Sequence, residues 1–238
     1  MRCYISKKDI EEISRGMINL YFKKAHREVE HRVDIEDFSK SFLGLKIEYV
    51  SFADPKKEKI GFLADGETPL VINSCGKRLQ YIFPNNTILL DDSLLKDAEP
   101  GRRQFTIAHE AAHYILKIID TTENQEVNQH SGYNDEVYSI DELSRLLAAK
   151  ERQADQMAAS LLMPEYLVDQ AMNKFLHSNL VKAYGEDVLS SQSKLSIKEM
   201  SRYLGVSYKS LLIRLKELNK IEYHDITEYI SKELHIGG

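Results

Sequence analysis

Hydrophobic positions recur every three to four residues along much of this chain, and this spacing predicts amphipathic helices. The first helix should begin after Ser6 and turn an apolar face inward as far as Phe22. A shorter helix should begin after Asp34 and end at Gly44, because aspartate caps helix starts and glycine commonly ends helices. The N-terminal part of the chain is therefore expected to be helical.

Four short runs rich in β-branched and aromatic residues interrupt the helical pattern and predict strands at 45–52, 59–64, 69–73 and 87–91. Asp65-Gly66 predicts a hairpin turn between the second and third runs. These strands should form a small, mostly antiparallel sheet that precedes further long helices. The resulting order of elements predicts an α+β fold.

The clearest helical pattern covers 101–120 and contains the motif H-E-A-A-H, with His109, Glu110 and His113. Residues four apart share one face of a helix, so the two imidazoles can bind one metal ion. Glu110 can then contact a water on that metal, and zinc lowers the pKa of such a water towards neutrality. A core helix that happens to carry two histidines is the alternative, and the glutamate and apolar flanks favour the metal site.

A catalytic zinc normally takes three protein ligands, so another residue must supply the third. A second long helix is predicted from Asp141 to the proline at 164, and Glu151 falls on its apolar face. A buried carboxylate is costly unless it is paired or bound to metal, which makes Glu151 the candidate ligand. Asp155, one turn further on, is the candidate acceptor for a ligand imidazole N–H. Alternatively, Glu151 lies at the edge of the stripe and pairs with a neighbouring basic residue.

The stretch between these two helices, 121–140, is polar and predicts a long loop. It contains His130, Tyr133 and Tyr138. Each of the three could face a substrate oxyanion, but we favour surface roles for them.

A serine-rich polar stretch at 184–194 predicts a linker, so we expect two units, 1–183 and 190–238. Beyond the linker, two helices joined by a tight turn at 204–206 have the pattern of a helix-turn-helix, with Ser207 as the N-cap of the second helix.

The segment 194–220 carries seven basic residues against two acidic ones. Such a segment could contact DNA phosphates. It could equally pack against the rest of the chain or bind a protein partner, and pairs of helices with a glycine turn commonly do so. We favour the second interpretation.

Composition limits the class of protein. The net charge of −5 argues against a chain that coats nucleic acid, and 42% hydrophobic with 29% charged residues is ordinary for a globular protein. The start has no apolar run typical of a signal peptide, and no segment approaches the roughly 18 apolar residues of a membrane span. Cys3 and Cys75 form no metal-binding pair by spacing. A cytoplasmic location is expected.

Three segments, FTIAHEAAHYIL, ERQADQMAASLLMP and LGVSYKSLLIRLKEL, resemble the ImmA/IrrE-type metallopeptidases in content and order. The resemblance covers most of 33–220. It includes the gluzincin pattern of H-E-x-x-H followed by E-x-x-x-D, which Glu151 and Asp155 meet. The chain departs from the family in having Ala111-Ala112 where H-E-L-G-H is common, and Gln153 where a second glutamate is frequent.

The resemblance implies a zincin-like, cytoplasmic zinc protease of bacterial or mobile-element origin that acts on a helix-turn-helix repressor. We therefore expect a Zn²⁺-dependent endopeptidase in which His109, His113 and Glu151 bind the metal. Glu110 should act as general base and then acid, and Asp155 should orient a ligand. Substrate backbone is expected to add to the sheet edge along 87–91.

Three alternatives stay open at this point. The chain could be a metal-bearing regulator of transcription with little turnover, in which the basic helices bind DNA or a repressor. It could hold a purely structural zinc, although Glu110 would then have no use beside the metal. Another divalent metal could replace zinc, because availability as well as affinity decides occupancy.

Overall fold

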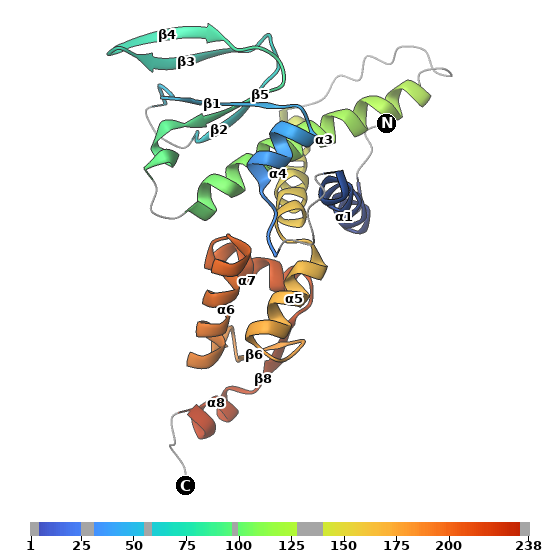
Figure 1. Cartoon of the computed structure of the whole chain (residues 1–238), viewed down its shortest axis with the longest axis vertical. Coiled ribbons are helices and arrows are strands. Elements are labelled where there is room, and N and C mark those ends of the chain that lie inside the picture. Colours follow the sequence, from blue (N-terminus) through green and yellow to red (C-terminus); the bar gives the residue numbers. More distant parts are fainter. Residues whose placement is uncertain (1–4, 25–30, 55–58, 97–99, 128–139, 234–238) are drawn as a thin grey trace.

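The computed structural model describes residues 5–24, 31–54, 59–96, 100–127 and 140–233, with side chains except at 121–127, 140–143, 232 and 233. It is a mixed α+β protein in which long helices pack beside small sheets (Figure 1). The helices α3 and α4 lie in the middle of the molecule, with the strands β1 to β5 towards one end and the C-terminal elements at the other. No described helix is long and apolar enough to cross a membrane.

The N-terminal helices follow the predicted pattern. Helix α1 (Lys7–Lys24) buries an apolar face, and Ser6 Oγ accepts a hydrogen bond from the Asp9 N–H at its start. Helix α2 (Ile35–Asp37) begins with Asp34, whose carboxylate accepts from the Asp37 N–H. A short π-helix, η1 (Phe38–Phe42), continues it before Gly44 turns the chain in the left-handed region.

The first sheet contains β1 (Lys46–Val50), β2 (Gly61–Ala64) and β5 (Thr87–Asp91) in the order β1-β5-β2. Strand β5 runs parallel to β1 and antiparallel to β2, and the 3-10 helix η2 (Asp92–Leu95) follows it. Because β5 lies between two partners and its first four residues are buried, it has no free edge. The expectation that a substrate pairs along 87–91 is therefore wrong. The edge strands of this sheet are β1 and β2, and β2 is the edge strand that contacts α3.

A separate two-stranded sheet contains β3 (Pro69–Ser74) and β4 (Lys77–Ile82). The Asp65 carboxylate accepts from the N–H groups of Glu67 and Thr68, so the predicted turn forms. It does not join paired strands, because β2 pairs with β5 and β3 pairs with β4. The predicted hairpin is thus wrong, and strand β4 was not expected from the sequence.

The longest helices, α3 (Pro100–Val127) and α4 (Ile140–Leu162), pack against each other. Small residues on these helices are completely buried, and they let elements of the core pack closely: Ala108, Ala112, Ala154 and Ala158. Both helices were predicted, although α3 extends seven residues beyond the expected end at 120. Helix α5 (Glu165–Phe175) follows Pro164, also as expected.

The C-terminal elements are β6 (Val181–Tyr184), β7 (Val188–Leu189), α6 (Ser191–Leu204), α7 (Tyr208–Glu217), β8 (Ile221–His224) and α8 (Ile226–Glu233). The stretch predicted as a linker instead forms the β6–β7 pair and the start of α6. Both predicted helices form, and Gly205 in the left-handed region separates them.

Most basic side chains of this C-terminal segment are engaged by acids. Lys216 pairs with Asp187 at 2.5 Å, and Lys220 pairs with Glu165 and Asp169 at 3.1 and 2.8 Å. Arg202 pairs with Glu199, and Arg214 is buried. The basic excess counted along the sequence is therefore largely neutralised in the folded chain.

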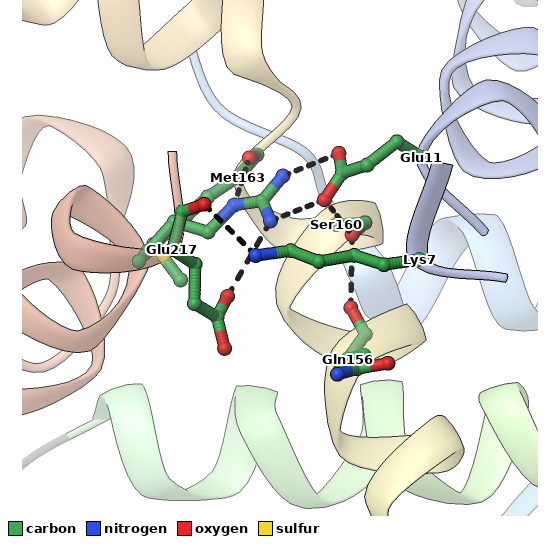
Figure 2. A network of polar contacts seen from close by, with 7 residues as sticks. Lys7, Glu11, Gln156, Ser160, Met163 and Glu217 are labelled. Carbon is green, nitrogen blue, oxygen red and sulfur yellow. Dashed lines mark hydrogen bonds and ion pairs between the residues drawn. The ribbon is translucent and has the colours of Figure 1, made fainter. Parts of the chain in front are cut away.

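Arg214 of α7 is 1% exposed and contacts Glu11 on α1 and Met163, which follows the end of α4. Figure 2 shows the network to which Glu11, Met163 and Glu217 belong. Its two terminal nitrogens donate to the two carboxylate oxygens of Glu11 at 2.5 and 2.7 Å, and its Nε donates to the Met163 carbonyl at 3.0 Å. Lys7 Nζ donates to the Glu217 carbonyl at 2.8 Å beside it. Burial alone would raise the pKa of Glu11, but the hydrogen bond and charge of Arg214 outweigh it and hold that pKa below its usual value.

One hydrophobic cluster extends from α1 through α3 and α4 to α7. Its members include Ile10, Ala108, Met157, Met200 and Leu211, all completely buried. A shared core of this kind couples the C-terminal helices to the rest of the chain, since neither part can bury its apolar face alone. The division into units 1–183 and 190–238 stays a prediction.

Candidate metal centre

Helix α3 presents His109 and His113 on one face, one turn apart, towards a cavity of about 860 Å³. Their Nε2 atoms lie 3.0 Å from each other. The opposite face is fixed in the core by Ala108, Ala111 and Ala112, which are completely buried. The helical spacing of the motif therefore brings both imidazoles to the same point, as predicted.

Helix α4 brings Glu151 to that point. Its carboxylate oxygens lie 3.3 Å from His109 Nε2 and 3.5 Å from His113 Nε2. Ligands of a tetrahedral zinc at bond lengths of about 2.0–2.1 Å are separated by roughly 3.3 Å. The three separations, 3.0, 3.3 and 3.5 Å, fit that geometry, so these side chains could hold a zinc ion.

Asp155, one turn along α4, contacts the far side of His109. Its Oδ1 lies 2.9 Å from His109 Nδ1. A proton on Nδ1, donated to this carboxylate, leaves Nε2 with its lone pair towards Glu151. Burial lowers the pKa of His109, but the hydrogen bond to Asp155 and the nearby carboxylates outweigh it and raise that pKa overall. Burial and the neighbouring His109 lower the pKa of His113, and they outweigh the charge and hydrogen bond of Glu151, which act in the opposite direction.

Glu110 lies beside the ligand cluster but not in it. It is 8% exposed, and the backbone N–H of Leu63 on β2 donates to its carboxylate. Burial raises the pKa of the Glu110 carboxyl to about 7, with His109 acting in the opposite direction and Glu151 in the same one. A carboxyl group with a pKa near neutrality can both accept and return a proton, which suits general acid–base catalysis.

The cavity is bounded on one side by β2 and on the others by α3 and α4. The carbonyls of Ile60 and Ala64 accept from N–H groups of the β5 side. Because backbone groups alternate in direction along a strand, those of Gly61 and Leu63 face the open edge towards α3. The site therefore combines a candidate metal cluster, a buried carboxyl group and a strand edge that pairs with no second strand among the described residues.

Glu151 is not the buried carboxylate that its place on the apolar stripe of the sequence predicts. The Glu151 side chain is 60% exposed and faces the cavity instead of the core, and Leu147, expected on the same buried face, is 56% exposed. The distances to both imidazoles are what make it a candidate ligand. Tyr133, Tyr138 and His130 lie outside the described residues.

The contribution of β2 was not anticipated from the sequence. Gly61 and Leu63 contact Glu110, although the run KIGFLA only predicts a strand. A glycine inside a strand is the signal that was available, because glycine weakens a strand and often marks a close approach of another group.

Comparison with known proteins identifies the class. Residues 73–216 match the model of the IrrE N-terminal-like domain, a family of M78 peptidases. The match covers more than half of the chain and includes both helices of the candidate centre. The chain belongs to this family, as the sequence motifs indicated.

Other comparisons are less informative. No curated protein matches the chain. Among solved structures, a Mycobacterium tuberculosis transcriptional regulator is similar with a TM-score of 0.48 and 14% identity. That likeness covers 89% of this chain and 47% of the regulator, so the chain spans about half the length of the structure that it matches.

Proposed function

We propose that the protein is a zinc-dependent endopeptidase with a zincin-like site. The observation that carries this proposal is the convergence of His109, His113 and Glu151 beside a buried glutamate that does not itself join the cluster. A structural zinc site has no use for such a carboxyl group or for an open cavity of about 860 Å³.

In the proposed mechanism, His109, His113 and Glu151 hold the zinc ion, and Asp155 fixes the tautomer of His109. Zinc, when bound, supplies Lewis acidity to the scissile carbonyl and lowers the pKa of its water. Glu110 would accept a proton at its carboxylate from the water that adds to the scissile carbonyl carbon, and would return it to the leaving amine as the C–N bond breaks. The edge of β2, apart from the Leu63 N–H that contacts Glu110, replaces 87–91 as the candidate for pairing with substrate backbone, since extended peptides bind by adding to a strand edge.

A protein substrate, in particular a helix-turn-helix repressor, is the class that the resemblance implies. We infer that the C-terminal helices pack against the chain rather than read DNA. A Cβ atom at Gly101, at the start of α3, would lie 2.6 Å from the Ser207 nitrogen at the start of α7. In a DNA-binding helix-turn-helix this end of the second helix reaches the bases. The close packing of the start of α7 against the start of α3, together with the pairing of the basic side chains, supports a packing role for the C-terminal helices instead of DNA binding.

Cleavage that depends on the metal tests the proposed function. The zinc-loaded chain, co-expressed with a candidate repressor or mixed with a proteome-derived peptide library, should create new peptide termini that mass spectrometry detects. Removing the metal with 1,10-phenanthroline should stop cleavage, and added zinc should restore it. Cleavage that persists without metal, or its absence in both states, would contradict the proposal.

Zinc binding tests the ligand assignment separately. Glu151→Ala should lower zinc occupancy strongly, because a three-ligand site loses one ligand. Asp155→Asn should weaken zinc affinity by about 10–100-fold without abolishing binding, since it acts through His109. Glu199→Ala on α6, whose partner is the exposed Arg202, is a matched control that should bind zinc normally. Competition with a chromophoric chelator measures each affinity, and full zinc retention in Glu151→Ala would exclude it as a ligand.

A further inference from the structure

Strand β2 crosses α3 at a glycine that lies directly against the candidate general base. A Cβ atom placed on Gly61 would lie 2.6 Å from Glu110 Oε1 and 3.3 Å from its Cδ. The same atom would lie 2.6 Å from Thr106 Cγ2, one turn earlier on α3. Real Cβ atoms essentially never come within 3.0 Å of another heavy atom, so any side chain at this position would displace a neighbour.

Nothing in the backbone explains why position 61 is glycine. Its φ angle is not in the left-handed region that favours glycine. It lies inside a paired strand, opposite Leu90 of β5, where glycine is normally disfavoured. The remaining reason is the space that the Glu110 carboxylate and the Thr106 methyl occupy.

Two residues further along the same strand edge, the Leu63 N–H donates to the Glu110 carboxylate. The strand can make this hydrogen bond only if it passes close to α3, and at Gly61 it passes so close that an added Cβ would meet the Glu110 carboxylate at 2.6 Å. Of the two clashing neighbours, the carboxylate is at the end of a flexible side chain. The Thr106 hydroxyl donates to the Arg102 carbonyl at 3.0 Å, which fixes the direction of its methyl. An added Cβ would therefore move the carboxylate most easily.

We propose that Gly61 is a positioning residue for Glu110: the bare backbone at position 61 lets the edge of β2 confine the carboxylate where the Leu63 N–H holds it. The inference rests on the proposed function for the role of Glu110, but its geometry is independent of what the substrate is. In a Gly61→Ala variant we therefore expect the Glu110 side chain and the three candidate zinc ligands to be present, with the Glu110 carboxylate displaced.

The test uses the zinc-loaded full chain with Gly61→Ala. Zinc affinity should stay within about threefold, because no ligand contacts position 61. The kcat should fall by about 10²-fold with little change in KM, since a misplacement of about 1 Å of a catalytic group costs that much. Gly16→Ala on α1, where an added Cβ meets nothing within 4 Å, is the matched control and should leave zinc affinity and kcat unchanged.

A second readout needs no substrate. Acetohydroxamate binds zinc and donates a proton to a neighbouring carboxylate, so its affinity reports where Glu110 lies. Its Kd should rise about tenfold in Gly61→Ala and in Glu110→Gln, because each loses a hydrogen bond to a charged group. Adding Gly61→Ala to Glu110→Gln should change the Kd by less than twofold, since the group through which position 61 acts is then already lost.

Adding Thr106→Ser to Gly61→Ala separates the two clashes. Serine keeps the hydroxyl and removes the methyl, so the defect should persist if the displaced carboxylate causes it. Restoration of kcat and of acetohydroxamate affinity by Thr106→Ser would instead assign the defect to helix packing and overturn the proposal. Zinc loss in Gly61→Ala, or additive effects of Gly61→Ala and Glu110→Gln, would also overturn it.

Failure of the proposed function gives a different result. A chain that cleaves nothing but binds acetohydroxamate in a Glu110-dependent manner leaves the positioning of Glu110 testable by Kd alone. A Kd that does not depend on Glu110 overturns the inference, because no role of that carboxylate remains for Gly61 to support.

Discussion

Glu110→Gln is expected to keep the fold and the zinc ion and to lower the rate of peptide hydrolysis by about 10²–10⁴-fold. The glutamine amide has the same shape as the carboxylate, and its oxygen can still accept from the Leu63 N–H. It cannot take a proton from water, so the general-base contribution is lost. Steady-state hydrolysis of a cleaved peptide, alongside metal analysis of the same preparation, measures both properties.

The same variant separates an enzyme from a metal-bearing regulator. His109→Ala should lose zinc and activity together, because it removes a ligand. In cells, an endopeptidase should lose its effect on the target protein's level as completely in Glu110→Gln as in His109→Ala. A regulator that needs only the metal-bound fold would keep its effect in Glu110→Gln and lose it in His109→Ala. That pattern would refute the peptidase hypothesis.

Arg214→Met is expected to lower the free energy of unfolding by about 3 kcal/mol, the lower end of the range for breaking a buried ion pair. The substitution leaves the Glu11 carboxylate without its bidentate partner and the Met163 carbonyl without its donor. The lower end applies because the Glu11 side chain is 27% exposed and keeps some contact with water. Urea unfolding followed by circular dichroism measures the loss, and the chain has no tryptophan to report it by fluorescence.

Arg202→Met supplies the matched control. Its partner Glu199 and Arg202 itself are exposed, so the change should cost less than about 1 kcal/mol. Adding Glu11→Gln to Arg214→Met should recover part of the loss, since the charge of the bidentate partner is then removed, while Glu217 still lacks its ion pair with Arg214. Equal costs for Arg202→Met and Arg214→Met would show that the C-terminal helices are held by apolar contacts alone.

Local patterns predicted the elements of this fold better than their pairing. The caps at Ser6 and Asp34 and the apolar faces of α1 and α3 follow from residues a few positions apart, and all were found. On α4 the predicted face is buried from Ala154 onwards, but Leu147 is exposed. Strand β4 has all six residues exposed, so no alternation of burial marks it in the sequence. The central place of β5 depends on a partner more than twenty residues away, which periodicity does not encode.

In the candidate site, too, relations within one helix could be predicted from the sequence better than contacts between elements. H-E-A-A-H fixes the relation of His109, Glu110 and His113 through helix geometry alone. Glu151 lies beside both imidazoles, but its side chain is exposed, so the burial argument that pointed to it is wrong. Its role as a ligand stays a prediction. The contacts of Gly61 and Arg214 could not be predicted from the sequence, because each residue contacts a partner that only the folded chain brings close.

The contact of Glu11 with Arg214 spans 203 positions of the chain and has a consequence for folding during synthesis. At a ribosomal rate of 5–20 residues per second, α1 is made roughly 10–40 s before its partner exists. During that interval its buried face and the Glu11 carboxylate have no native contact on α7. The nascent chain therefore cannot complete its core until α7 has been made, and a stalled chain that lacks α7 would be an early target for chaperones and cellular proteases.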